Sequence, residues 1–116
     1  MEFLKQILSG IEACTGVKPT AFNTSTVFEL PAINYQAFRQ SDDGAVESWR
    51  LETRCVADSM LESLELDSSI AECIVTVGDE DRFLCTRIVQ NGGGVLEDTA
   101  TGKPITISYF DITTKS

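Results

Sequence analysis

The chain contains no histidine among its 116 residues. Nucleophilic sites built on a Ser-His or Cys-His pair need an imidazole base, so its absence excludes them. It also removes a common zinc ligand, and the four cysteines, at positions 14, 55, 73 and 85, form no C-x-x-C pair. The sequence therefore predicts a protein that is not an enzyme, with no catalytic residue, no metal site and no cofactor.

Basic residues are scarce: nine Lys and Arg stand against eighteen Asp and Glu, a net charge of -9. A surface that neutralises phosphates needs the opposite balance, so specific nucleic-acid binding is not expected. Long hydrophobic runs are also missing. None approaches the length of a membrane span, and Glu2 and Lys5 interrupt the apolar start that a signal peptide would need. We therefore expect no membrane partner.

The cysteines are expected to be reduced. Cys14, Cys55 and Cys73 each fall on the apolar face of a predicted element, where a free thiol behaves as a small hydrophobic side chain. A cytoplasmic setting would keep such thiols unpaired.

Several short stretches resemble chemical motifs but lack a required residue. In "GGGV", Gly92 to Val95, Glu97 replaces the third glycine of a dinucleotide loop, and in "TGKP", Pro104 replaces the hydroxyl residue of a phosphate loop. Residues 79–81 are acidic but lack the spacing of a calcium loop. Adjacent carboxylates at 42–43 and 97–98 fall on predicted turns rather than in a buried site. These stretches are predicted to be loops and solvated turns.

The N-terminal segment predicts a helix over about residues 2–15, followed by Gly16 as a stop signal. Its apolar residues recur at spacings of three and four: Phe3, Leu4, Ile7, Leu8, Ile11 and Cys14. Residues 17–30 are rich in Thr, Ser and Asn and predict a connecting loop with a short extended piece.

Two strands, 32–40 and 45–57, are predicted to form a hairpin through the Asp43-Gly44 turn. The second strand alternates between two faces. Trp49 and Leu51 lie on the apolar face, which should belong to the core, while the other face carries Arg50, Glu52 and Arg54.

A helix should begin near residue 60, because Ser59 and Glu62 form an S-x-x-E capping box. Two closing strands are expected over 83–91 and 105–113, separated by a mobile excursion from Gly92 to Lys103. The order predicts a single α+β domain over residues 1–116. A mostly antiparallel sheet of about four strands would be covered on one face by two helices.

The whole pattern resembles the tail terminator, or tail completion, proteins of long-tailed bacteriophages. The resemblance rests on element order, on "P-x-I-x-Y" at Pro31 to Tyr35, on the charge alternation at Arg50 to Arg54, and on the closing "ITISYFDI". It implies a structural protein of the virion, located at the head-tail junction, that forms a ring, commonly a hexamer, on the finished tail tube. Such a ring stops tube growth and offers a face to the head.

The resemblance implies three partners: further copies of this chain, the tail tube protein, and a head connector or head-completion protein. Arg50, Glu52 and Arg54 are candidate subunit-interface residues, the alternative being a solvated strand face with cross-strand partners such as Gln36. Loop residues that could contact tube or connector are Ser41, Asp42, Asp43, Gly44, Gly92, Gly93, Gly94 and Lys103.

Two other hypotheses remain open at this stage. A phage head-completion protein or tail tube subunit would have a similar compact α+β design. A small acidic ligand-binding domain or enzyme would instead hold a pocket between the second helix and the sheet, around Trp49 and Tyr109.

Overall fold

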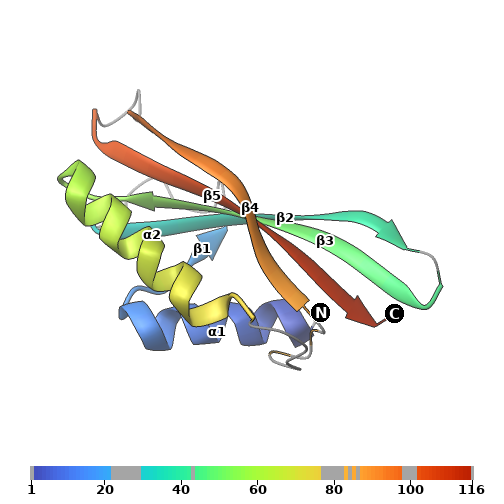
Figure 1. Ribbon diagram of the computed structural model, residues 1–116. Helices are drawn as coiled ribbons and strands as arrows, with labels where there is room; N and C mark the ends of the chain where they lie inside the picture. The colour runs from blue at the N-terminus through green and yellow to red at the C-terminus, as the bar shows by residue number, and fades with distance from the viewer. Residues whose placement is uncertain are drawn as a thin grey trace.

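The structure, a computed structural model, describes residues 2–21, 30–42, 44–76, 83, 85, 87–97 and 102–115. Two helices lie on one side of a five-stranded sheet (Figure 1). The elements are α1 (Glu2–Thr15), β1 (Thr20–Ala21), β2 (Ala32–Asp42), β3 (Val46–Val56), α2 (Met60–Ile74), β4 (Arg87–Glu97) and β5 (Pro104–Lys115). The strand order is β1-β2-β3-β5-β4, and every pairing except β1 with β2 is antiparallel. The predicted α+β fold class is confirmed.

Helix α1 has the predicted bounds, and its apolar stripe buries Ile7 and Ile11 completely. Helix α1 ends at Thr15. The Thr15 hydroxyl donates to the Ile11 carbonyl at 2.7 Å and accepts from the Val17 amide at 3.1 Å. Gly16 follows with a φ of 75°, a conformation that glycine adopts without steric penalty.

Helix α2 begins where the capping box places it. The Ser59 hydroxyl accepts a hydrogen bond from the Glu62 amide at 3.2 Å and so satisfies one of the free donors of the first turn. Ile70 and Ile74 are fully buried against the sheet and α1. Neither described helix is both long and apolar enough to cross a bilayer.

The β2–β3 hairpin is confirmed. Gly44 has a φ of 91°, and its amide donates to Asp42 Oδ1 at 2.8 Å, so the turn depends on both residues. Trp49 is only 9% exposed on the helix side of β3, as the alternation predicts, and packs edge-on against Phe3.

The core lies between the helices and one face of the sheet. Its fully or almost fully buried members include Ile7, Ile11, Ile33, Leu51, Cys55, Ile70, Ile74, Cys85, Ile88, Phe110 and Ile112. Phe110 pairs with Leu51 on one side and Gln90 on the other, so it lies in an interior row of the sheet. A second, smaller cluster of Ala32, Val56, Ile105 and Ile107 is buried on the opposite face.

The closing region differs from the prediction. Strand β4 runs from Arg87 to Glu97, so the three glycines lie in a strand and not in a mobile loop. Pairing with β5 on one side holds them there, and a register shift between Gln90 and Gly93 absorbs the irregularity. Gly93 lies so close to the Ile107 carbonyl that a Cβ would clash with it. Residues 84 and 86, near the start of the predicted strand 83–91, lie outside the described residues. So does the predicted acidic turn at 79–81.

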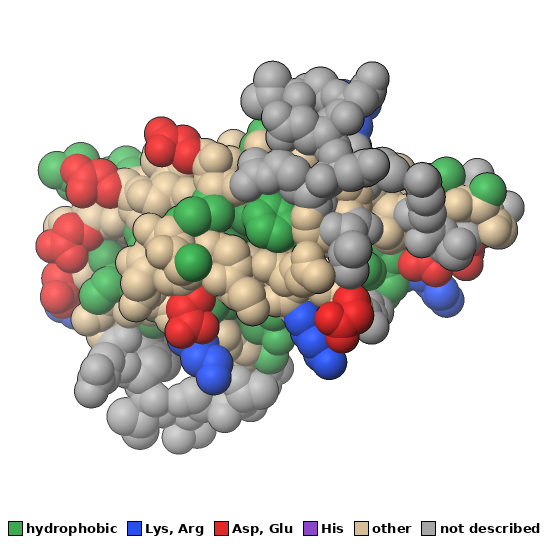
Figure 2. Space-filling view, turned by 90° about the horizontal axis from the view of Figure 1, so that it is seen from below, with side chains coloured by type: hydrophobic (Ala, Val, Ile, Leu, Met, Phe, Trp, Pro, Cys, Tyr) green, Lys and Arg blue, Asp and Glu red, His purple; other side chains and the backbone are tan. Residues whose placement is uncertain are grey.

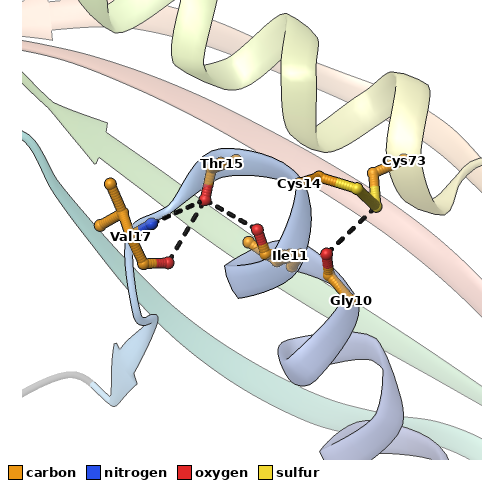
Figure 3. Close-up of a disulfide and its surroundings, with 6 residues drawn as sticks. All are labelled: Gly10, Ile11, Cys14, Thr15, Val17 and Cys73. Carbon is orange, nitrogen blue, oxygen red and sulfur yellow. Dashed lines mark hydrogen bonds between the residues drawn. A yellow bond between two sulfur atoms is a disulfide. The ribbon is translucent and has the colours of Figure 1, made fainter.

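Two further points correct the sequence interpretation. The sheet has five strands rather than about four, because Thr20 and Ala21 pair in parallel with β2. The expectation of four reduced cysteines is wrong: Cys14 of α1 and Cys73 of α2 form a disulfide, with Cα atoms 6.5 Å apart (Figure 3). Both sulfurs lie on the helix sides that face each other, which no sequence spacing reveals. Cys55 and Cys85 are free and buried.

Candidate subunit-contact surface

The predicted charge row lies on the sheet face opposite the helices, and its charges have partners within the chain. Arg50 Nε donates to Asp111 Oδ1 at 3.2 Å, and its guanidinium carbon lies 5.6 Å from the centroid of the Tyr109 ring. The other Asp111 oxygen accepts from Asn91 Nδ2 at 2.7 Å. Arg50 is thus paired with residues of its own sheet.

Arg54 and Glu52 also pair with each other. Arg54 Nε donates to Glu52 Oε2 at 2.9 Å, and Glu52 is 6% exposed, opposite Gln36 in the neighbouring strand. The Arg54 side chain of this pair is 42% exposed and the Glu52 side chain only 8%, so solvent reaches the pair mainly from the arginine side. The structure confirms that the row is on the outer face; its role between subunits stays a prediction.

The predicted contact loops fall in two separate places. Ser41 and Asp42 are exposed at the end of β2 and Gly44 lies in the turn, while Asp43 is outside the described residues. The three glycines, Gly92 to Gly94, are exposed in β4. Lys103 directly precedes β5, and its Nζ lies 3.2 Å from Asp58 Oδ1. The β2–β3 turn and the strand ends at Glu97 and Pro104 are at opposite ends of a molecule 43 Å long (Figure 1).

The alternative ligand pocket around Trp49 and Tyr109 is not supported. Trp49 belongs to the cluster beneath the helices, whereas Tyr109 packs against the small cluster on the other face. A single pocket cannot hold both rings. Within the described ranges, no three Cys, Asp or Glu side chains are grouped so that they could hold a metal ion.

An apolar surface that the sequence did not predict lies where α2 begins and β4 ends. Five large hydrophobic side chains there are between 38% and 66% exposed: Met60, Leu61, Leu64, Val95 and Leu96. Figure 2 shows hydrophobic and acidic side chains gathered at this end of the molecule. The sequence did contain a signal for this surface. Val95 and Leu96 are adjacent in one strand, so their side chains point to opposite faces and cannot both enter the same core.

Two grooves meet at this surface and share Val95. One, of about 260 Å³, lies between Met60 and the residues that end β4 and begin β5. The other, of about 270 Å³, runs along the glycines of β4 between Leu64 and Ser108, and Asp67 lines it. We call the second the glycine groove.

The floor of the glycine groove is polar. Asp67 of α2 is 8% exposed, and Ser108 Oγ donates to its Oδ1 at 2.7 Å. Gln90 Nε2 donates to the same Ser108 oxygen at 3.0 Å, which joins α2, β5 and β4 in one network. Burial raises the pKa of Asp67, and the hydrogen bond from Ser108 opposes that shift only in part. The charge of Asp67 is therefore poorly compensated by the described residues.

Replacing Asp67 by Asn should leave the protein equally or more stable at neutral pH. The folded chain holds the Asp67 proton more strongly than the unfolded chain does, so the wild type loses stability as pH rises from the unfolded pKa through the raised folded pKa. An amide avoids this loss and can still accept from Ser108. Urea unfolding at neutral pH and near pH 4 should show the advantage of D67N shrinking at the lower pH.

The exposed residue Glu65 of the same helix provides the control, since Glu65→Gln removes a charge that faces solvent. A D67N variant that is less stable than the wild type at neutral pH would contradict the assignment of Asp67 as a poorly compensated buried carboxylate.

Burial also raises the pKa of both free thiols. The pKa of Cys55 is raised by burial and, to a smaller extent, by the nearby charge of Asp67. Burial raises the pKa of Cys85 to about 11. Both cysteines therefore stay protonated at neutral pH and act as small core side chains.

Comparison with known proteins gives a match at the level of structure. No protein-family model matches the sequence, and no curated protein matches it. Among solved structures, the chain is similar to the one described as "Structure of bacteriophage SPP1 gp17 protein", with a TM-score of 0.57 and 12% sequence identity. The match covers 96% of this chain and 87% of that chain. The α+β fold described above is therefore one that a bacteriophage protein also has.

Proposed function

We propose that this chain is a structural protein of a long-tailed bacteriophage that caps the tail tube as a ring of identical copies. In this role it ends tail polymerisation and provides the surface on which the head is joined. The supporting observation is the fold shared with a bacteriophage protein over almost the entire chain. The order of elements and the short phrases of the sequence point to the same class independently.

The proposed partners are further copies of the chain, the tail tube protein and the head connector or head-completion protein. The proposed location is the head-tail junction of the virion, after assembly in the host cytoplasm. A net charge of -9 suits a ring through which DNA must slide without adhering, because like charges repel.

The described shape is compatible with a ring. The molecule measures 43 × 25 × 22 Å, and its two ends differ: the end of β2 and the start of β3 lie at one, and the start of α2, the end of β4 and the start of β5 lie at the other (Figure 1). Unlike surfaces on one chain can meet head to tail, and rings are built from contacts of this heterologous kind.

Native mass spectrometry over a wide concentration range tests the proposal directly. We expect one discrete closed oligomer, a hexamer, in equilibrium with monomer. In the parent phage, loss of the gene should give headless particles with overlong tails. Tails of normal length joined to heads in that mutant would contradict the terminator role, and tailless heads lacking any tube would favour a tube subunit instead.

Arg50 and Arg54 are proposed as a secondary part of the contact between copies. Both are already paired within the chain. They should therefore determine how two copies align and which partner is selected more than they raise the affinity between copies. Replacing both by Gln, which keeps side-chain length, should leave the circular dichroism spectrum unchanged and raise the midpoint concentration for assembly a few-fold. An unchanged midpoint would assign the row to a solvated strand face.

A further inference from the structure

Among the described residues, the sheet has two open edges. At β4, Thr76 hydrogen-bonds Ile88 through both its amide and its hydroxyl, and no strand of the described chain pairs with residues 89–97 on that side. At β2, strand β1 pairs only with Asn34 and Tyr35, which leaves 36–42 without a strand on that side within the described ranges. Open edges present backbone donors and acceptors that can pair with another chain.

The two edges are compatible in direction. Pairing is antiparallel from β2 to β3, from β3 to β5 and from β5 to β4, so β2 and β4 run in opposite directions. When β2 of a second copy is set beside β4 in the same plane, the new pair is antiparallel. The helices of both copies then lie on the same side, and the contact can repeat from copy to copy.

Each open edge carries exposed hydrophobic side chains. Phe38 on β2 is 42% exposed, and Val95 and Leu96 on β4 are 44% and 47% exposed. Large apolar side chains beside an unpaired edge favour association, and natural sheets usually protect such edges with charges or a covering segment.

From these edges we propose that residues 36–40 of one copy pair antiparallel with residues 92–96 of the next, with Arg39 opposite Gly93 and its guanidinium in the glycine groove beside Asp67. The inference rests on the proposed ring and specifies the contact that closes it. The partner is a second copy of this chain.

The charges of Arg39 and Asp67 select the register in which Arg39 lies opposite Gly93. Arg39 pairs with Trp49 in its own sheet, so it lies on the helix side, where it is exposed. Gly93 pairs with Ser108, the residue that donates to Asp67. The glycines of β4 have no side chains to fill the groove, so a long side chain from a neighbour can enter. A guanidinium there would supply the cationic partner that the buried carboxylate lacks among the described residues.

The apolar residues agree with the same register. With Arg39 opposite Gly93, Phe38 falls opposite Gly94 on the outer face, diagonal to Leu96. On the helix side, Ala37 falls opposite Val95. Gly94 leaves room for the Phe38 ring, because a Cβ placed there would meet no atom within 4 Å.

The register also implies a stagger between copies. Within one chain, Gly94 lies level with Asn34 through the pairs Gly94–Ile107, Ile107–Arg54 and Arg54–Asn34. Placing Phe38 opposite Gly94 therefore shifts the next copy by four residues along the strands. A shift between successive strands is what a sheet needs in order to close on itself.

Thiol cross-linking tests the register. The variant with Ala37→Cys and Val95→Cys changes two side chains of suitable size, and a short bifunctional maleimide should link them between copies. We expect a ladder of covalent oligomers ending at the ring size. The matched control pairs Ala37→Cys with Val89→Cys, since Val89 lies on the same strand but on the outer face and six residues away. Wild-type chain, whose free thiols are buried, serves as the blank.

The outcomes separate this contact from the proposed function. A ring by native mass spectrometry together with a ladder specific to the Val95 pair supports the contact. A ring in which the Val95 pair links no better than the Val89 pair overturns the contact and leaves the ring intact. A chain that stays monomeric at every concentration overturns both.

A double-variant cycle tests the Arg39–Asp67 pair. R39Q and D67N should each fold as the wild type does, and each should raise the midpoint concentration for assembly at least about tenfold, because a charge-assisted contact is lost. The R39Q/D67N double variant should have a midpoint concentration no higher than that of the single variant that assembles less tightly. Additive losses would overturn the pairing. K5Q removes an exposed charge on α1, outside both strand edges, and should leave the midpoint unchanged.

Discussion

Breaking the disulfide between Cys14 and Cys73 is expected to lower the free energy of unfolding by about 4 kcal/mol, because the bond closes a loop of 59 residues in the unfolded chain. The bond also joins α1 to α2, and these helices cover the sheet together (Figure 3). The variant carrying Cys14→Ser and Cys73→Ser should therefore melt more than about 10 °C below the wild type.

Two controls isolate the bond. Reductant should lower the melting temperature of the wild type to that of the double-serine variant and should not change the variant. Thiol titration of the denatured, unreduced protein should find two reactive thiols, those of Cys55 and Cys85. Four thiols and a melting temperature insensitive to reductant would show that the helices are held by packing alone.

Replacing Phe110 by Ala should cost about 3 to 5 kcal/mol of stability, the range for large aromatic side chains in a closed core. Phe110 has no exposed surface and lies in an interior row of the sheet beneath the helices, so little can move in to fill the cavity. Chemical denaturation of the monomer, below the concentration at which copies associate, measures this loss.

Phe38 provides the matched comparison. It is 42% exposed at the open edge of β2, so Phe38→Ala should change the stability of the monomer by less than about 0.5 kcal/mol. The same variant should weaken assembly, because Phe38 lies in the proposed contact. A large loss of monomer stability in F38A, or a small one in F110A, would contradict the assignment of one ring to an interface and the other to the core.

Local signals predicted the elements whose residues interact over short separations. The three- and four-residue spacing defined α1, the Ser59 and Glu62 pair defined the start of α2, and the Asp-Gly turn with its flanking alternation defined the β2–β3 hairpin. The same alternation placed Trp49 in the core and Arg50 on the outer face correctly, because in a strand the side is set by parity alone.

Strand β4 was mispredicted because its signal is not local. Three consecutive glycines have no intrinsic preference for an extended strand, and only pairing with β5 holds them there. The candidate contact surface was missed for a related reason. Leu64 fits a helix stripe and Val95 fits a strand, but whether each is covered depends on what packs beside it in the folded chain, and both stay exposed.

The sequence by itself determined the α+β class, the order of the main elements, the two faces of β3 and the lack of imidazole chemistry. These follow from composition and from side-chain periods of 2 and 3.6, which a linear chain carries in full. Only the tertiary structure decided that Cys14 meets Cys73, that Asp67 is buried beside Ser108, and that two sheet edges stay open within the part of the chain that the structure describes. Each of these depends on the distance between residues at least 40 positions apart or on what lies beside a strand, and a chain acquires both only when it folds.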